Sequence, residues 1–228
     1  MKILIIAVFT LAASWLNSMA AEYYVAISGS DANAGTASAP WRTIQKAANT
    51  LVAGDTVRVR PGSYNERVTE NTSGTAGNYI TYMSDSPTNA VVFGFYISGS
   101  YIRIIGFQMT HPSNLDYEAV RVSGGKHVEV LDNYIHNVST SGAGSGVTYG
   151  GASYLVVRGN TIAYTGSPGN NNGSGAKAIG NISGGSVPVL IEYNKISHTT
   201  DYLTPEGGYH IYRNNVLGPT TTSDFGGT

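Results

Sequence analysis

Apolar and polar residues alternate in short runs along most of the chain. In "HVEVL", for example, Val128 and Val130 alternate with His127 and Glu129. A period of two buries one face of an extended strand and leaves the other face in solvent. No helical stripe competes with this pattern between residues 55 and 217. The pattern therefore predicts an all-β domain made of many short strands.

A second pattern returns at a longer spacing. An apolar residue stands three positions before an asparagine, and another stands two positions after it, in VEVLDNYI (128–135), VVRGNTI (156–162), LIEYNKI (190–196) and IYRNNVL (211–217). The asparagines are separated by 27, 34 and 21 residues, and they are Asn133, Asn160, Asn194 and Asn215. Structural repeats of this size with loops of variable length are typical of a solenoid.

Each repeat contains three short strands. Around Asn133 the pattern predicts strands over 119–122, 127–131 and 134–138, with a glycine turn after the first strand and a bend at Asp132-Asn133. Three strands per turn describe a parallel β-helix, and a β-sandwich with unrelated surface turns is the alternative. Asn tolerates a left-handed backbone at the bend, and stacked amides can hydrogen-bond from turn to turn.

The segment before the repeats has a different pattern. Ile44, Ala47, Ala48 and Leu51 form one apolar helical face, and Gly54 ends the predicted helix. A helix at this place would cover the open end of the solenoid, where unpaired strand edges invite aggregation. We therefore predict an N-terminal strand and capping helix over residues 21–54 and a parallel β-helix over residues 55–228.

The first twenty residues predict a secretory signal peptide. They contain an early lysine, an apolar stretch over residues 3–16 and the small-x-small site Ser18-Met19-Ala20. A retained N-terminal anchor is the alternative, although the run is shorter than the roughly 20 apolar residues of a membrane span. We expect a secreted, extracellular or periplasmic monomer with no membrane contact after cleavage.

Composition narrows the picture further. Charged residues make up 12% of the chain and the formal net charge is -1, so no basic field indicates nucleic-acid binding. The chain has 29 glycines, which suits tight turns between strands, and no cysteine, so disulfides do not stabilise it. The last predicted turn is followed by no closing helix or polar strand. We therefore expect either a C-terminal truncation or a cylinder that is closed by a partner.

Residues 23–68 resemble a known protein family. They are similar to the N-terminal module of secreted right-handed parallel β-helix proteins of the pectate lyase-like superfamily, which includes polysaccharide lyases. The matching residues are Tyr24-Val25, Gly29-Ser30-Asp31, Asn33, Gly35-Thr36, Pro40-Trp41, Thr43-Ile44-Gln45, Ala47-Ala48, Gly54-Asp55-Thr56-Val57, Pro61-Gly62 and Tyr64. The resemblance implies a right-handed β-helix and cleavage of an acidic, uronate-containing polysaccharide by β-elimination.

β-Elimination needs a base, positive charge for the developing enolate and cations that hold carboxylates. Candidates lie on or just before the first strand of successive turns. Lys177 precedes Ala178-Ile179 as Glu118 precedes Ala119-Val120. We predict Lys177 as the base, provided that burial or nearby cations lower its pKa, and Arg121 as carboxylate clamp or acid. Further substrate-binding candidates are Arg158, Tyr149, His198 and Tyr202.

The resemblance also implies calcium. The candidate oxygen ligands lie in or near equivalent loops and are Asp116, Glu118, Asp201 and Glu206. The chain lacks the cluster of adjacent aspartates typical of calcium-dependent lyases, and its five histidines show no convincing metal spacing. "SGSDANAGT" alternates like part of a calcium loop but lacks a downstream glutamate, so a structural turn is favoured.

Other activities are kept as alternatives. The Asp-Asp pair and Gly-His-Gly expected of a polygalacturonase are absent, which argues against inverting hydrolysis. An epimerase of a uronic-acid polymer would share the proton abstraction without creating chain ends. A non-catalytic glycan-binding or adhesive β-helix is the main alternative to the lyase.

Overall fold

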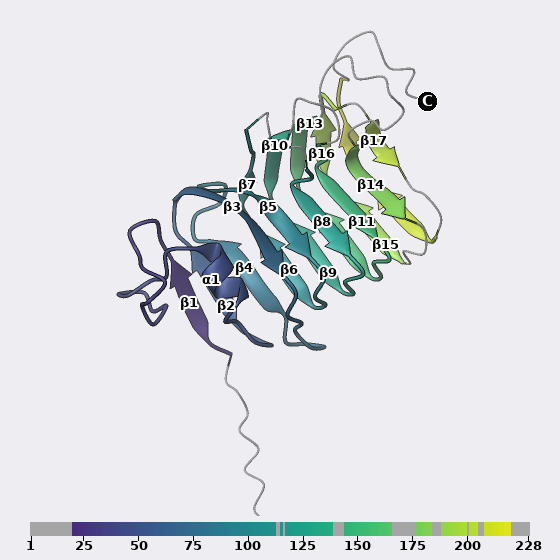
Figure 1. Ribbon diagram of the computed structural model, residues 1–228. Coiled ribbons are helices and arrows are strands. Elements are labelled where there is room, and N and C mark those ends of the chain that lie inside the picture. The colour runs from purple at the N-terminus through teal and green to yellow at the C-terminus, as the bar shows by residue number, and fades with distance from the viewer. Residues whose placement is uncertain are drawn as a thin grey trace, which may run out of the picture.

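A computed structural model describes residues 20–112, 115, 117–138, 144–165, 177–183, 188–199, 201–204 and 208–219. These residues form a cylinder of stacked parallel strands, with one strand on each of three sides in a typical turn (Figure 1). The predicted all-β parallel β-helix is confirmed. Around Asn133 the strand boundaries agree with the predicted ones to within about one residue, as expected for such assignments.

The three sides are named here in the order in which the chain visits them. Side one consists of β3 (Gly62–Glu70), β5 (Ala90–Ile97), β8 (Val120–Ser123), β11 (Val147–Gly150), β14 (Lys177–Ser183) and β17 (Asp201–Thr204). Side two consists of β1 (Glu22–Val25), β2 (Thr56–Val59), β4 (Ile80–Ser84), β6 (Ile102–Ile105), β9 (Val128–Leu131), β12 (Leu155–Arg158), β15 (Val189–Glu192) and β18 (His210–Arg213). Side three consists of β7 (Gln108–Met109), β10 (Tyr134–Val138), β13 (Thr161–Thr165), β16 (Lys195–Ser197) and β19 (Val216–Leu217).

The long strands β3 and β5 bend across the corner between sides three and one. Val91 and Val92 of β5 pair with β7 on side three, whereas the segment from Phe95 to Ile97 pairs with β8 on side one. Sides one and three are therefore continuous in hydrogen bonding at this end of the cylinder, while side two forms a separate sheet.

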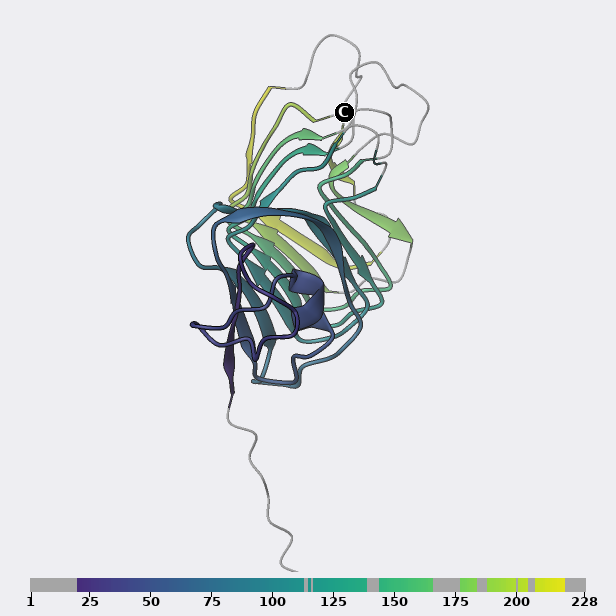
Figure 2. The same cartoon turned by 60° about the vertical axis from the view of Figure 1, so that its left-hand side comes forward.

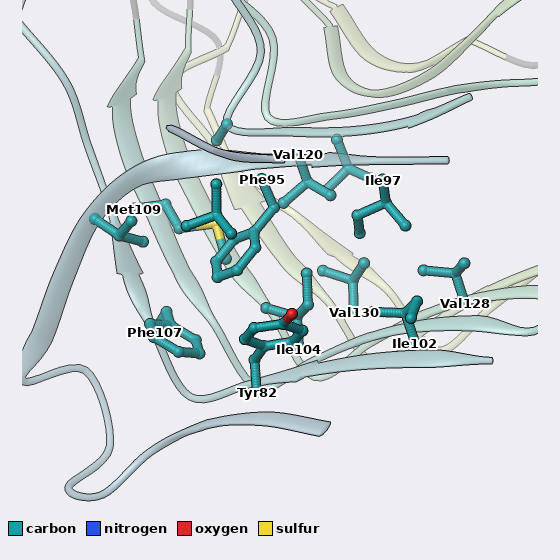
Figure 3. Packing of buried hydrophobic residues seen from close by; sticks show 14 of the residues in the cluster. Tyr82, Phe95, Ile97, Ile102, Ile104, Phe107, Met109, Val120, Val128 and Val130 are labelled. Atoms are coloured by element: carbon teal, nitrogen blue, oxygen red, sulfur yellow. The ribbon is translucent and has the colours of Figure 1, made fainter. Parts of the chain in front are cut away.

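Alternate residues of all three sides fill the cylinder. Tyr82, Phe95 and Phe107 meet at its centre, with ring centroids 5.6 Å and 5.3 Å apart in edge-to-face contacts (Figure 3). Aliphatic side chains of later turns continue the same rows, and the predicted inward residues Val128 and Val130 are fully buried. Burial of this continuous apolar column stabilises the fold, since a single turn has too little apolar surface to be stable alone.

The recurring asparagines form a ladder at the bend between sides two and three. Oδ1 of Asn160 accepts hydrogen bonds from the backbone N–H and the Nδ2 of Asn133, both at 3.0 Å. Asn194 does the same for Asn160, and Asn215 does the same for Asn194. Each Nδ2 also reaches a carbonyl oxygen of the preceding turn, as from Asn160 to Val130 at 2.9 Å. The predicted stacking of amides is confirmed.

The expected backbone role of these asparagines is wrong. The left-handed residue is the one just before the ladder position, and it is Asp132, Gly159, Tyr193 or Asn214, with φ of 53°, 70°, 56° and 56°. The ladder asparagine must direct its amide into the cylinder to meet the amides above and below. The turn in the backbone therefore falls on its exposed or half-exposed neighbour, and the amide chemistry selects Asn at the ladder position.

The N-terminal helix is shorter than predicted. Helix α1 spans Ile44–Ala48, and it starts where the Thr43 side chain accepts a hydrogen bond from the Lys46 N–H. Its apolar face is buried as expected, and Leu51 reaches the core from the turn that follows. Asn49 caps the helix, so Gly54 lies beyond its end. Figure 2 shows α1 at the N-terminal end of the cylinder, beside the first strands.

Asp31 anchors the turn that precedes α1. Its Oδ1 accepts hydrogen bonds from the backbone N–H groups of Arg42 and Thr43, and its Oδ2 accepts one from the Thr43 hydroxyl. The carboxylate is thus committed to loop structure, in agreement with the structural turn favoured for "SGSDANAGT".

Within the described residues, no helix is long and apolar enough to cross a membrane. The predicted signal peptide lies almost wholly outside the described residues.

A buried carboxyl group predicts a pH-dependent stability. Glu70 is fully buried, and its oxygens accept hydrogen bonds from the Tyr82 hydroxyl and the Thr72 N–H. Burial raises the pKa of Glu70 above its usual value. The protonated Glu70 carboxyl group therefore stabilises the fold. This stabilisation is fully present below the unfolded-state pKa of about 4.3 and is lost as pH rises through the folded-state pKa.

We expect Glu70→Gln to remove this fall in stability, because a carboxamide does not ionise. Urea unfolding between about pH 4 and pH 8 should give a flatter stability profile for the variant than for the wild type. Asp132→Asn removes the same charge at an exposed position and is the control. Parallel profiles for wild type and Glu70→Gln would contradict the prediction.

Candidate functional site

Two rows of positions run along the outer face of side one, parallel to the cylinder axis. Strand pairing aligns the first row through successive turns as Thr69, Tyr96, Arg121, Thr148, Gly180 and Thr204. The second row lies three residues earlier in each turn, just before or at the start of the strands. It contains Glu118, Ser145, Lys177 and Asp201, because Val120, Val147 and Ile179 are in register and Lys177 pairs with Asp201.

Two arginines share one carboxylate near β8. Arg121 Nη1 donates to Glu118 Oε1 at 2.9 Å, and Arg67 Nη2 donates to Glu118 Oε2 at 3.1 Å. The three charges sum to one net positive charge. The Arg67 guanidinium also lies 4.4 Å from the ring centroid of Tyr117 and 5.7 Å from that of Tyr96. We call Arg67, Glu118 and Arg121 the arginine cluster.

Close packing of β5 against β8 brings Arg67 within reach of this cluster. Arg67 pairs with Gly94, and a Cβ at Gly94 would lie only 2.1 Å from the carbonyl oxygen of Ala119. The absence of a side chain at Gly94 therefore lets β5 approach the segment leading into β8. The Arg67 side chain then spans from β3 to Glu118 across β5.

Lys177 lies at the start of β14 with its side chain along the same outer face. Its backbone N–H donates to Ser145 Oγ at 2.9 Å, and its Nζ donates to the Asn181 carbonyl at 3.3 Å. A Cβ at Gly180 would come within 2.4 Å of Lys177 Cδ, so the aliphatic stem lies across Gly180. Gly180 belongs to the row that contains Arg121, and the lysine stem therefore lies in that row.

This contact predicts that Gly180→Ala displaces the lysine. The new methyl group would overlap Lys177 Cδ and Thr204 Oγ1, both in side chains that can rotate away. We expect a lower rate of any reaction that uses Lys177, by roughly tenfold or more for a misplaced group, with little change in stability. Steady-state kinetics and thermal unfolding of the variant measure the two effects. Wild-type kinetics, or a loss of folding, would contradict this account.

The structure brings together only some of the predicted site residues. Arg121 and Lys177 lie on the outer face of side one, with β11 between their strands (Figure 1). Arg158 lies on side two, where its Nε donates to Glu192 at 2.6 Å, so it does not belong to this face. His198 follows β16 on side three and stacks on Tyr164, with 4.6 Å between ring centroids.

The predicted surface contact of Tyr149 is wrong, and Tyr202 lies partly buried against the core. Tyr149 is fully buried, because it pairs in register with the inward-facing Val122. Burial raises the pKa of its hydroxyl. Tyr202 packs against the core, and its hydroxyl donates to the carbonyl of Gly218 on the last described turn. The Tyr149 ring is therefore unavailable as a platform on the outer face, whereas the Tyr202 ring is partly buried.

The predicted calcium ligands find no support among the described side chains. Glu118 already has its charge balanced by two guanidinium groups, which disfavours its use as a calcium ligand. No group of three or more histidine, aspartate or glutamate side chains that could hold a metal occurs within the described residues. Asp116 and Glu206 lie outside the described residues, as does the side chain of Asp201.

Three residues of the face were missed by sequence reasoning, and they are Arg67, Tyr96 and Tyr117. Alternation alone marks the first two as outward. Arg67 precedes the buried Val68, and Tyr96 stands between the buried Phe95 and Ile97. Their meeting with Glu118 could not be deduced in this way, because it depends on how β3 and β5 align with the turn before β8.

A family comparison agrees with this architecture. A family model described as "Pel9A-like, right handed beta helix region" matches residues 23–188, which is well over half of the chain. The chain belongs to the Pel9A-like right-handed β-helix family. The handedness and the superfamily expected from the sequence are thereby confirmed.

Solved structures similar to this Pel9A-like chain show the same fold. Pectate lyase Pel9A is 21% identical with a TM-score of 0.71, covering 92% of this chain and 58% of that chain. A rhamnogalacturonan lyase is 17% identical with a TM-score of 0.59, covering 89% and 63%. An alginate lyase from Paenibacillus sp. str. FPU-7 is 19% identical with a TM-score of 0.50, covering 76% and 72%.

A relative from Bacillus subtilis (strain 168) is closer in sequence. The uncharacterized protein YwoF is 32% identical over 136 residues, which cover 52% of this Pel9A-like chain and 29% of YwoF. The chain thus spans less than a third of YwoF and about three fifths of the rhamnogalacturonan lyase and of Pel9A. At these identities the solved structures establish the fold, and the reaction has to be argued from the site.

Proposed function

We propose that this chain cleaves an acidic, uronate-containing polysaccharide by β-elimination on the outer face of side one. The observation that carries the proposal is the alignment of Lys177 with the arginine cluster along one face, two strands apart. The names of three structural neighbours, which are pectate, rhamnogalacturonan and alginate lyases, support the same class of substrate.

Lys177 is the proposed base. In its neutral form the amine takes the proton on the carbon next to the uronate carboxylate, and the electron pair of that C–H bond forms a carbon–carbon double bond. The bond to the glycosidic oxygen breaks, and the departing oxygen takes up a proton. The products are a new reducing end and an unsaturated uronide, so atoms and charge balance without an external oxidant or nucleophile.

The arginine cluster is proposed to hold a neighbouring sugar rather than the reacting one. Arg121 and Lys177 lie two strands apart, which is about 10 Å between backbones. Glu118 holds the Arg121 guanidinium at the level of β8. The guanidinium is therefore positioned to bind the carboxylate of an adjacent sugar residue, and this placement favours the clamp role of Arg121 over the acid role.

The aromatic side chains around the cluster fit the same substrate. Tyr96 and Tyr117 flank Arg67 on the outer face, and both are partly exposed. Flat rings with a polar tip pack against the apolar faces of sugars while the hydroxyl remains hydrated. Secretion of the chain after cleavage of residues 1–20 belongs to this proposal, because such a polymer is encountered outside the cell.

Incubation with polygalacturonate, alginate or rhamnogalacturonan, with and without calcium, tests the proposal. We expect a rise in ultraviolet absorbance from unsaturated uronide ends on at least one of these polymers. A change in uronate configuration without new chain ends would identify an epimerase instead. Absence of both changes on all three polymers would overturn the proposed reaction.

A further inference from the structure

The outer face of side two carries a long row of positions in register. Strand pairing aligns one residue from each of seven successive strands, and they are Thr56, Thr81, Arg103, Glu129, Val156, Leu190 and Ile211. Six strand spacings correspond to roughly 29 Å along the cylinder axis. The row changes from hydroxyl side chains through an Arg103–Glu129 ion pair to aliphatic side chains.

A wall of aromatic rings borders this row at the corner toward side one. Tyr101, His127 and Tyr154 stack with ring centroids 4.6 Å and 4.5 Å apart and with planes within 8° and 2° of parallel. All three residues have φ between 54° and 56°. Tyr79 continues the wall with an edge contact to Tyr101, at 5.7 Å.

The face between row and wall is hollowed in two places. One cleft of about 370 Å³ includes Thr56, Thr81, Tyr79 and Arg103 among its lining residues. A second cleft of about 280 Å³ includes Tyr79, Tyr154, Val156, Leu190 and Ile211. Tyr79 lines both clefts, so the two clefts adjoin at this residue. We call the two clefts together the side-two groove.

Positive charge lies along the other border of the groove at its C-terminal half. Arg158, Glu192 and Arg213 are aligned in successive strands, and both arginines donate through Nε to the single carboxylate. The Glu192 side chain is 2% exposed, whereas those of Arg158 and Arg213 are 48% and 57% exposed. Although burial opposes ionisation, hydrogen bonds from Arg213 and Arg158 lower the pKa of Glu192. The triad thus presents one net positive charge to solvent.

The shape of this face argues against an added peptide strand. Backbone groups of the inner strands are already paired within the parallel sheet, and among the described strands of side two only the outer ones, β1 and β18, have an unpaired edge. A linear sugar polymer needs no such edge, because it binds through ring faces and hydroxyl groups. The groove offers apolar side chains, tyrosine hydroxyls and exposed guanidinium groups along one line.

We propose that the side-two groove is a second, non-catalytic binding site for a linear acidic polysaccharide. It lies on a different side of the cylinder from Lys177 and the arginine cluster, so it does not depend on the proposed lyase reaction. In this proposal Arg158 binds the polymer on side two and not on the face that carries Lys177. A polysaccharide held in the side-two groove keeps the protein attached to the polymer while the outer face of side one is empty.

The test measures binding of the full chain by affinity electrophoresis in gels containing polygalacturonate or alginate, with neutral dextran as comparison. All variants carry Lys177→Met so that the polymer is not degraded. Tyr154→Asn removes a wall ring that is 52% exposed, and Asn tolerates the left-handed backbone there. We expect a roughly 3- to 10-fold rise in Kd for the acidic polymer. Ile211→Glu places a negative charge in the groove and should weaken binding as well.

Tyr164→Asn is the matched control. Tyr164 is 50% exposed with φ 54°, but it lies on side three, so binding should not change. Wild-type binding by Tyr154→Asn, an equal loss in both tyrosine variants, or a preference for dextran would each overturn the proposal. So would self-association that Tyr154→Asn abolishes in a protein that binds no polymer. Binding that depends on Tyr154, together with no uronide release by the chain that retains Lys177, would support this site and reject the lyase.

Discussion

Lys177→Met should reduce the release of unsaturated uronide by roughly 10²- to 10⁴-fold, the range typical for loss of a general base. Methionine keeps an unbranched stem that can lie across Gly180, as the lysine stem does. The amine is lost, and with it the group that accepts the proton. The measurement is the rate of ultraviolet absorbance change at saturating polymer, with binding followed separately by affinity electrophoresis.

Two controls separate a catalytic role from a structural one. Lys126→Met removes an exposed lysine at the turn between sides one and two and should leave the rate unchanged. Arg121→Gln should raise KM more than it lowers kcat, because a clamp on a neighbouring sugar contributes mainly to binding. Wild-type rates in Lys177→Met would refute the assignment of the base, whatever the binding data show.

Asn160→Ala should destabilise the fold by roughly 3–5 kcal/mol, because several buried hydrogen-bonding groups lose their partner together. Asn160 is fully buried. Its Oδ1 accepts from the N–H and the Nδ2 of Asn133, and its Nδ2 donates to the Val130 carbonyl and to Asn194 Oδ1. No water replaces these contacts without opening the core. For a chain of this length the midpoint of thermal unfolding should fall by on the order of 10 °C.

Asn65→Ala is the matched control for the ladder. Asn65 is exposed on β3, and no hydrogen bond of its side chain occurs within the described residues. Its replacement should change the free energy of unfolding by about 0.5 kcal/mol or less. An Asn160→Ala variant that unfolds at the wild-type temperature would show that the amide ladder accompanies the bend without stabilising it.

Tyr149 and Arg67 show how far the placement of side chains can be predicted from the sequence alone. Alternation within "VTY" puts Val147 and Tyr149 on the same face of β11, and the pairing with Val122 makes that face the inner one. The sequence therefore contains the information that argues against the substrate contact predicted for Tyr149. Arg67 was recognisable as outward, whereas its partner Glu118 is 51 residues away.

The sequence by itself determined the solenoid, the three strands of each turn, the inward rows and the asparagine ladder. These features follow from local periods of two and from a motif that recurs at every turn, and they do not depend on loop length. Only the tertiary structure decided which outward residues share a face. The loops between turns differ in length, so the lateral partners of Lys177, Arg121 and Arg158 are set by strand pairing across the stack, which acts between residues far apart in the chain.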